Sequence, residues 1–185
     1  MTPHIPSPAT ARPVPLRSGA WLRLMGVLET GRALLSRTPE SAIALLGRFS
    51  VAAVFWASGQ TKIEGLSLDL VAGRFEWGWP QLAPGAVDLF RDEYRLPLLA
   101  PETAATLAAL GEHVLPLMLL LGLGTRLAAL GLLLMTAVIQ FAVYPSAYAT
   151  HGVWAAVLLW LVARGPGAVS LDRLFVPGRA ARDGR

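Results

Sequence analysis

The chain has 185 residues, of which 54% are hydrophobic and 15% charged, and its mean hydropathy is +0.52. A soluble domain carries about 25% charged residues, so the composition excludes an ordinary soluble domain. The net charge of +4 comes mainly from arginines in the terminal segments, and no basic face typical of nucleic-acid binding is visible. The chain has no cysteine, which excludes disulfides, a dithiol redox relay and thiolate metal sites.

The first forty residues predict two kinds of N-terminal structure. Five prolines in Met1–Ser18 predict disorder. In Gly19–Arg37, apolar residues recur at helical spacing between arginines, which predicts an amphipathic helix along the cytoplasmic head groups; a flexible basic leader is the alternative. We therefore divide the chain into a leader with this helix (1–40), a membrane domain (41–175) and a basic cytoplasmic tail (176–185).

Four apolar stretches of near membrane-spanning length dominate the rest of the chain. They are Ala42–Thr61, Thr103–Leu123, Leu127–Tyr144 and Ala147–Ala163. A bilayer core requires about 20 apolar residues per helix, and the two short turns after the second and third stretches make their flanking helices antiparallel neighbours. The predicted fold class is all-α, an integral membrane four-helix bundle that contacts the lipid bilayer.

The one long connection, Ile63–Pro101, is acidic and aromatic. We expect Gly85–Leu99 to form a short interfacial helix, and Trp77 and Trp79 suit the aromatic belt at the membrane surface. The aromatic content predicts a structured outer loop packed over the bundle. Since the flanks and the Arg126 turn are basic, the positive-inside rule places both termini in the cytoplasm.

Polar side chains from all four helices fall in or near the outer half of this bundle. Glu112 lies near the middle of the second helix, while Gln140 and His151 lie roughly 6 Å further out by helical rise. Gln60 and Lys62 lie at the outer end of the first helix. Arg48 lies roughly 7 Å inward of the midplane. Ionisable groups at membrane depth mark a functional site or an internal pair.

Structural roles are the alternative for each of these residues. Arg48 and Glu112 are predicted to form an ion pair that fixes helix register, a role that competes with a chemical one for Glu112. His113 could be a helix-contact residue, and Lys62 could extend its ammonium to the outer head groups. The three histidines lack metal-ligand spacing, so no metal site is predicted.

Several separated motifs occur in the order typical of one membrane family. They are Arg48-Phe49, Phe55–Lys62, Phe90–Leu99 with Pro101-Glu102, Glu112-His113 with Pro116, Gly122–Arg126, His151 with Trp154-Ala155, and Gly165–Gly167 with Ser170–Asp172. In these residues the chain resembles the DoxX family over about Ala42 to Phe175. The resemblance implies a bacterial inner-membrane protein of four helices, related to the small membrane subunit of thiosulfate:quinone oxidoreductase.

Two classes of function fit these observations. The first is a membrane subunit of a quinone-linked redox system. Its quinone pocket would be lined by Trp56, Gln60, Gln140 and Trp154, with Glu112 and His151 as catalytic proton donors. A soluble or peripheral redox protein would then carry the other electron centre. The second class is a non-catalytic anchor or assembly protein that recruits soluble partners. A transporter fits less well, because four spans without repeats offer little machinery for alternating access.

Overall fold

The computed structural model describes residues 19–36, 38–69 and 73–175. The chain divides into two units, Met1–Thr38 and Pro39–Arg185. In the first unit, α1 (Gly19–Leu35) is helical as predicted; its position on the head groups stays a prediction. The predicted disordered leader (1–18), Arg37 and the basic tail (176–185) lie outside the described residues.

Four helical segments of the second unit are long and apolar enough to cross a membrane. They are Glu40–Gln60 (α2), Pro101–Leu121 (α4), Thr125–Val143 (α5 with η2) and Pro145–Arg164 (η3 with α6). Each agrees with a predicted span to within a few residues. The all-α bundle is therefore confirmed, and the protein is a multi-pass membrane protein.

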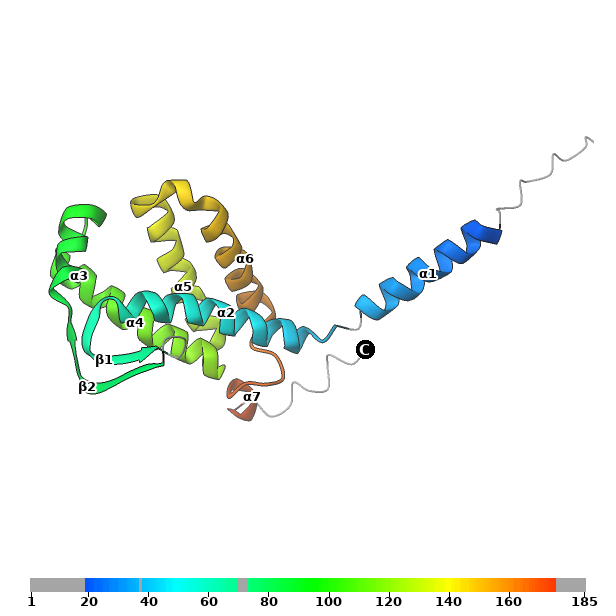
Figure 1. Ribbon diagram of the computed structural model, residues 1–185, viewed down its shortest axis with the longest axis horizontal. Coiled ribbons are helices and arrows are strands. Elements are labelled where there is room, and N and C mark those ends of the chain that lie inside the picture. The colour runs from blue at the N-terminus through cyan, green and yellow to red at the C-terminus, as the bar shows by residue number, and fades with distance from the viewer. Residues whose placement is uncertain (1–18, 37, 70–72, 176–185) are drawn as a thin grey trace, which may run out of the picture. The chain divides into compact units, whose positions relative to one another are not determined.

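Helix pairing follows the short turns. α5 (Thr125–Val138) continues into the π-helix η2 (Ile139–Val143), and the 3-10 turn η3 (Pro145–Ala147) leads into α6 (Tyr148–Arg164). In Figure 1, α5 and α6 form one antiparallel pair, while α2 runs beside α4. The bundle core is made of small and branched aliphatic side chains around one aromatic ring: Ala44, Val51, Phe55, Leu119, Ala128, Ala129, Leu132, Leu158 and Leu161.

The connection between α2 and α4 contains a β-hairpin that the sequence analysis did not predict. β1 (Ile63–Asp69) pairs antiparallel with β2 (Arg74–Leu82), and Leu66 lies opposite Trp77. The alternation Phe75-Glu76-Trp77-Gly78-Trp79 carries the period of two typical of strands. Trp77 and Trp79 are 79% and 84% exposed, and their place in an aromatic belt stays a prediction.

The predicted interfacial helix is present but shorter than expected. α3 (Pro84–Asp88) runs into the π-helix η1 (Leu89–Tyr94), so the helical stretch ends at Tyr94 instead of Leu99. Arg95 adopts a left-handed backbone with φ of 45°, and Pro97 prevents the helix from resuming. Phe90 packs on Ala104 and Ala105 of α4, which confirms a structured loop over the bundle.

A buried arginine fastens the end of the bundle where α4 stops, which is the inner end in the predicted orientation. Arg48 donates hydrogen bonds to the carbonyls of Leu119 and Leu120 at the end of α4, and to those of Pro166 and Val169 after α6. Gly122 ends α4 with φ of 70°, and a methyl group there would lie 2.9 Å from the Arg48 guanidinium. Glycine thus gives both the left-handed turn and the space for the arginine.

Candidate functional site

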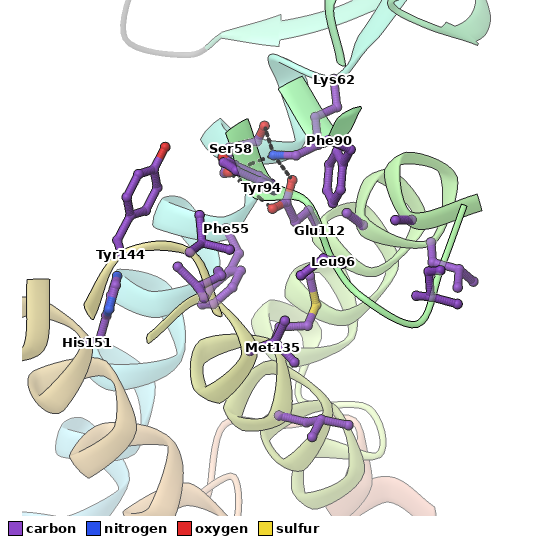
Figure 2. A pocket seen from close by; sticks show the side chains of 18 of the residues that line it. Phe55, Ser58, Lys62, Phe90, Tyr94, Leu96, Glu112, Met135, Tyr144 and His151 are labelled. Carbon is purple, nitrogen blue, oxygen red and sulfur yellow. Dashed lines mark hydrogen bonds and ion pairs between the residues drawn. The ribbon is translucent and has the colours of Figure 1, made fainter. Parts of the chain in front are cut away.

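A buried ion pair joins the outer end of α2 to the middle of α4. The Nζ atom of Lys62 lies 2.7 Å from Oε2 of Glu112, and both side chains are 5% exposed. Ser58, one helical turn before Lys62, donates a hydrogen bond of 3.1 Å to Oε1 of Glu112 and also contacts the Lys62 ammonium. Ser58 of α2 and Lys62, in the turn directly after α2, therefore hold the carboxylate of Glu112 together (Figure 2).

The predicted pair of Arg48 with Glu112 does not form. Arg48 bonds to four backbone carbonyls at the inner end, and Lys62 takes the place beside Glu112. The prediction assumed that a guanidinium would bridge the difference in depth along the helices. The carbonyls at the end of α4 lie closer to Arg48 than Glu112 does. They have no partner within the helix, so they accept hydrogen bonds from the guanidinium. Lys62 is buried and does not extend to the head groups.

Gln60 and His113 form a second contact between α2 and α4. The Leu68 amide donates to Oε1 of Gln60 at 2.7 Å, so the Gln60 amide nitrogen faces Nε2 of His113 at 2.9 Å. Nδ1 of His113 lies 2.7 Å from the carbonyl of Ala109. A carbonyl only accepts, so these partners assign a neutral His113 with its proton on Nδ1.

The same contact attaches the β-hairpin to the bundle. Trp56 donates from Nε1 to the carbonyl of Leu68 at 3.3 Å, and its ring meets the edge of His113 with centroids 5.0 Å apart. A methyl group at Gly59 would lie 2.8 Å from the His113 ring, so glycine permits this close packing. Trp56 and Gln60 thus hold strand β1, and His113 is a helix-contact residue.

Gln140 of η2 meets His151 in the first turn of α6. The Gln140 amide nitrogen donates to the carbonyl of Pro145 at 2.8 Å, which leaves its Oε1 to accept from Nδ1 of His151 at 2.7 Å. The His151 ring lies 5.1 Å from that of Trp154, which lies 5.7 Å from Phe55. The bond that Nδ1 of His151 donates to Gln140 fixes the His151 ring and leaves Nε2 as the acceptor nitrogen of that ring.

A cavity of about 440 Å³ lies between the outer halves of these helices, under the η1 segment. Figure 2 shows Lys62, Ser58 and Glu112 together, with Tyr144 and His151 lying away from them. Glu112, His151 and Trp154 line the cavity, while their predicted roles toward a quinone stay predictions. Gln140 instead lines a neighbouring hollow of about 360 Å³ that also includes His151. Trp56 and Gln60 line neither of these two hollows.

Tyr94 and Tyr144 form the part of the cavity wall that sequence reasoning missed. Their rings meet edge to face with centroids 5.8 Å apart, and the Tyr144 hydroxyl donates to Oε1 of Glu93. Burial raises the pKa of Tyr94, and the bond to Glu93 raises that of Tyr144. Both phenols therefore stay protonated at neutral pH. Because the two tyrosines lie far apart along the chain, no local sequence pattern indicated this contact.

Comparison with known proteins identifies the family. The family model for DoxX matches residues 43–145, more than half of the chain. The chain belongs to the DoxX family. The comparisons matched no curated protein and no solved structure. The DoxX match includes Lys62, Glu112 and Gln140, while His151 and Trp154 follow it on α6.

Proposed function

We propose that this DoxX protein is the membrane subunit of a quinone-linked redox system, and that it holds the ring of a quinone or quinol in the 440 Å³ cavity. One observation carries the proposal. The cavity has largely apolar walls and contains a buried carboxylate, Glu112, beside an ammonium. Small-molecule sites combine such walls with a few placed polar groups, and volumes of about 300–1,000 Å³ are typical.

The polar atoms of the cavity match what a quinol ring requires. Glu112 lines the cavity with its carboxylate held by Lys62 and Ser58, and we assign it to accept a hydrogen bond from a ring hydroxyl. Tyr94 adds a protonated phenol to the wall, while the Tyr144 hydroxyl already donates to Glu93. Phe55, Phe90 and Trp154 supply aromatic wall.

Glu112 and His151 are the groups we assign to proton exchange. The Lys62 ammonium compensates the charge of Glu112 when the carboxylate is ionised. Gln140 orients His151 so that its Nε2 can take or return a proton. A quinone supplies the capacity to take up electrons and protons together. The electrons come from a soluble or peripheral redox protein outside this chain.

We place the protein in the bacterial inner membrane with both termini in the cytoplasm. The segments before α2 and after α6, together with the Arg126 turn, carry more arginines than the connection between α2 and α4, which holds Arg74, Arg91 and Arg95. This bias follows the positive-inside rule. The cavity then lies in the outer half of the bilayer.

Thermal protection by a quinone tests the proposal. At a hundredfold excess over its Kd, a tail-less tetramethylbenzoquinone should raise the melting temperature of the purified protein by about 5–10 °C. His151→Leu should abolish the shift and Gln140→Leu should reduce it. His113→Leu is the matched control: it removes a histidine outside the cavity and should keep the shift. If wild type shows no shift, the anchor function replaces this proposal. If His151→Leu keeps the shift, the role assigned to His151 is wrong.

A further inference from the structure

The cavity has one apolar wall that borders lipid. Leu107 of α4 and Leu134 of α5 line it and are 54% and 67% exposed. Val138, also on α5, lines it and is 40% exposed. All three lie within membrane-spanning segments, so the exposed parts of their side chains face acyl chains. The cavity therefore opens sideways between the outer halves of α4 and α5.

Two close contacts form the floor of this opening. A methyl group at Gly111 of α4 would lie 2.9 Å from Sδ of Met135, and one at Gly131 of α5 would lie 2.8 Å from Leu115. Small residues let the helix backbones approach closely here. Toward the outer side the interface changes from glycine contacts to the larger side chains that line the cavity.

The roof separates the cavity from the outer aqueous side. Phe90 is 6% exposed and packs on Ala104 and Ala105 of α4. Tyr94 stacks edge to face on Phe90, with centroids 4.9 Å apart. Arg91 of the same segment bonds to Glu102 at 2.9 Å, which ties the roof to the start of α4. A ligand that approaches from water thus meets packed aromatic rings, whereas one that approaches from the lipid meets leucine side chains.

We propose that the opening between α4 and α5 is a lateral portal for a quinone with a long prenyl or alkyl chain. The ring lies in the cavity and the chain leaves between Leu107 and Leu134 into the bilayer. This inference rests on the proposed function and narrows its ligand to lipid-dissolved quinones. A cavity of about 440 Å³ has room for the ring but not for a long chain. Because an apolar chain is unfavourable in water, it needs an opening into the lipid.

Bulky substitutions in the portal test this inference. Leu134→Trp adds bulk at the opening. Leu130→Trp is the matched control, because Leu130 lies one turn inward on the same face of α5, is 53% exposed and does not line the cavity. Binding of a prenylated quinone and of tetramethylbenzoquinone is measured in lipid nanodiscs. Leu134→Trp should weaken binding of the prenylated quinone by at least about fivefold more than binding of tetramethylbenzoquinone, which corresponds to the lower range of overpacking costs. Leu130→Trp should change neither.

The outcomes separate the portal from the proposed function. Leu107→Trp, on the opposite side of the opening, provides a second variant and should reproduce the selective loss. If wild type binds both quinones and both portal variants keep wild-type affinity, the portal is overturned while the proposed function stands. Equal weakening of both quinones would show a disturbed ring cavity and would also overturn the portal. If wild type binds neither quinone, the proposed function fails and the portal with it.

Discussion

Removing one partner of the Lys62–Glu112 pair should destabilise the bundle strongly. The two side chains are 5% exposed and their charged atoms lie 2.7 Å apart. Breaking a buried pair leaves an uncompensated charge and typically costs about 3–5 kcal/mol. Glu112→Gln keeps the shape of the side chain, so its cost should come from the ammonium left without its partner. At about 2–4 °C per kcal/mol for chains of this size, the melting temperature should fall by about 6–20 °C.

A double-mutant cycle isolates the pair from other effects. Melting temperatures of Glu112→Gln, Lys62→Met and the double variant are measured in one detergent. The double variant removes both charges and should cost less than the sum of the single changes by about 2 kcal/mol or more. The cycle of Glu112→Gln with Arg48→Gln is the control and should be additive, because these residues share no partner among the described residues.

Two results would refute this reasoning. Strict additivity of the Lys62 and Glu112 changes would show that the residues do not interact in the folded protein. Strong coupling of Arg48 with Glu112 would restore the pair that the sequence suggested. Either result would also weaken the proposed function, because Glu112 would then lack the Lys62 ammonium that compensates its charge beside the cavity.

Three further predictions address the inner end, the roof and the topology. Arg48→Lys should cost at least about 3 kcal/mol, since one ammonium does not reproduce the hydrogen bonds to four carbonyls; a loss below about 1 kcal/mol in detergent melting would contradict this. The hydrogen bond from Tyr144 to Glu93 raises the pKa of the phenol, so this contact should stabilise the roof below pH of about 10 and be lost as the pH rises further. Ultraviolet titration of wild type against Tyr144→Phe measures this pKa, and Glu93→Gln should lower it; an ordinary value in wild type would exclude the contact. A cysteine at Asp88 should react with an impermeant thiol reagent in intact spheroplasts while one at Arg173 should not, and reversed labelling would overturn the proposed orientation.

Local patterns in the sequence determine much of this protein by themselves. The four spans follow from the length of the apolar runs, because the thickness of a bilayer sets how many apolar residues a crossing helix needs. Short turns such as Gly124-Thr125 determine which helices are neighbours. The alternating aromatic residues of β2 also carry a strand signal, but the prolines and tryptophans of this connection equally suit an aromatic cap at the membrane surface, so the hairpin was not predicted.

Tertiary structure decided which polar groups meet. Depth along a helix follows from sequence, but the partner of a side chain depends on helix rotation and crossing, which packing of all the helices sets together. Glu112 therefore pairs with Lys62, while the carbonyls at the inner end of the bundle take Arg48. Gln60 holds a hairpin strand, and Gln140 holds His151. The cavity itself results from two close glycine contacts below it and a packed aromatic roof above it, a relation between distant segments that no local pattern encodes.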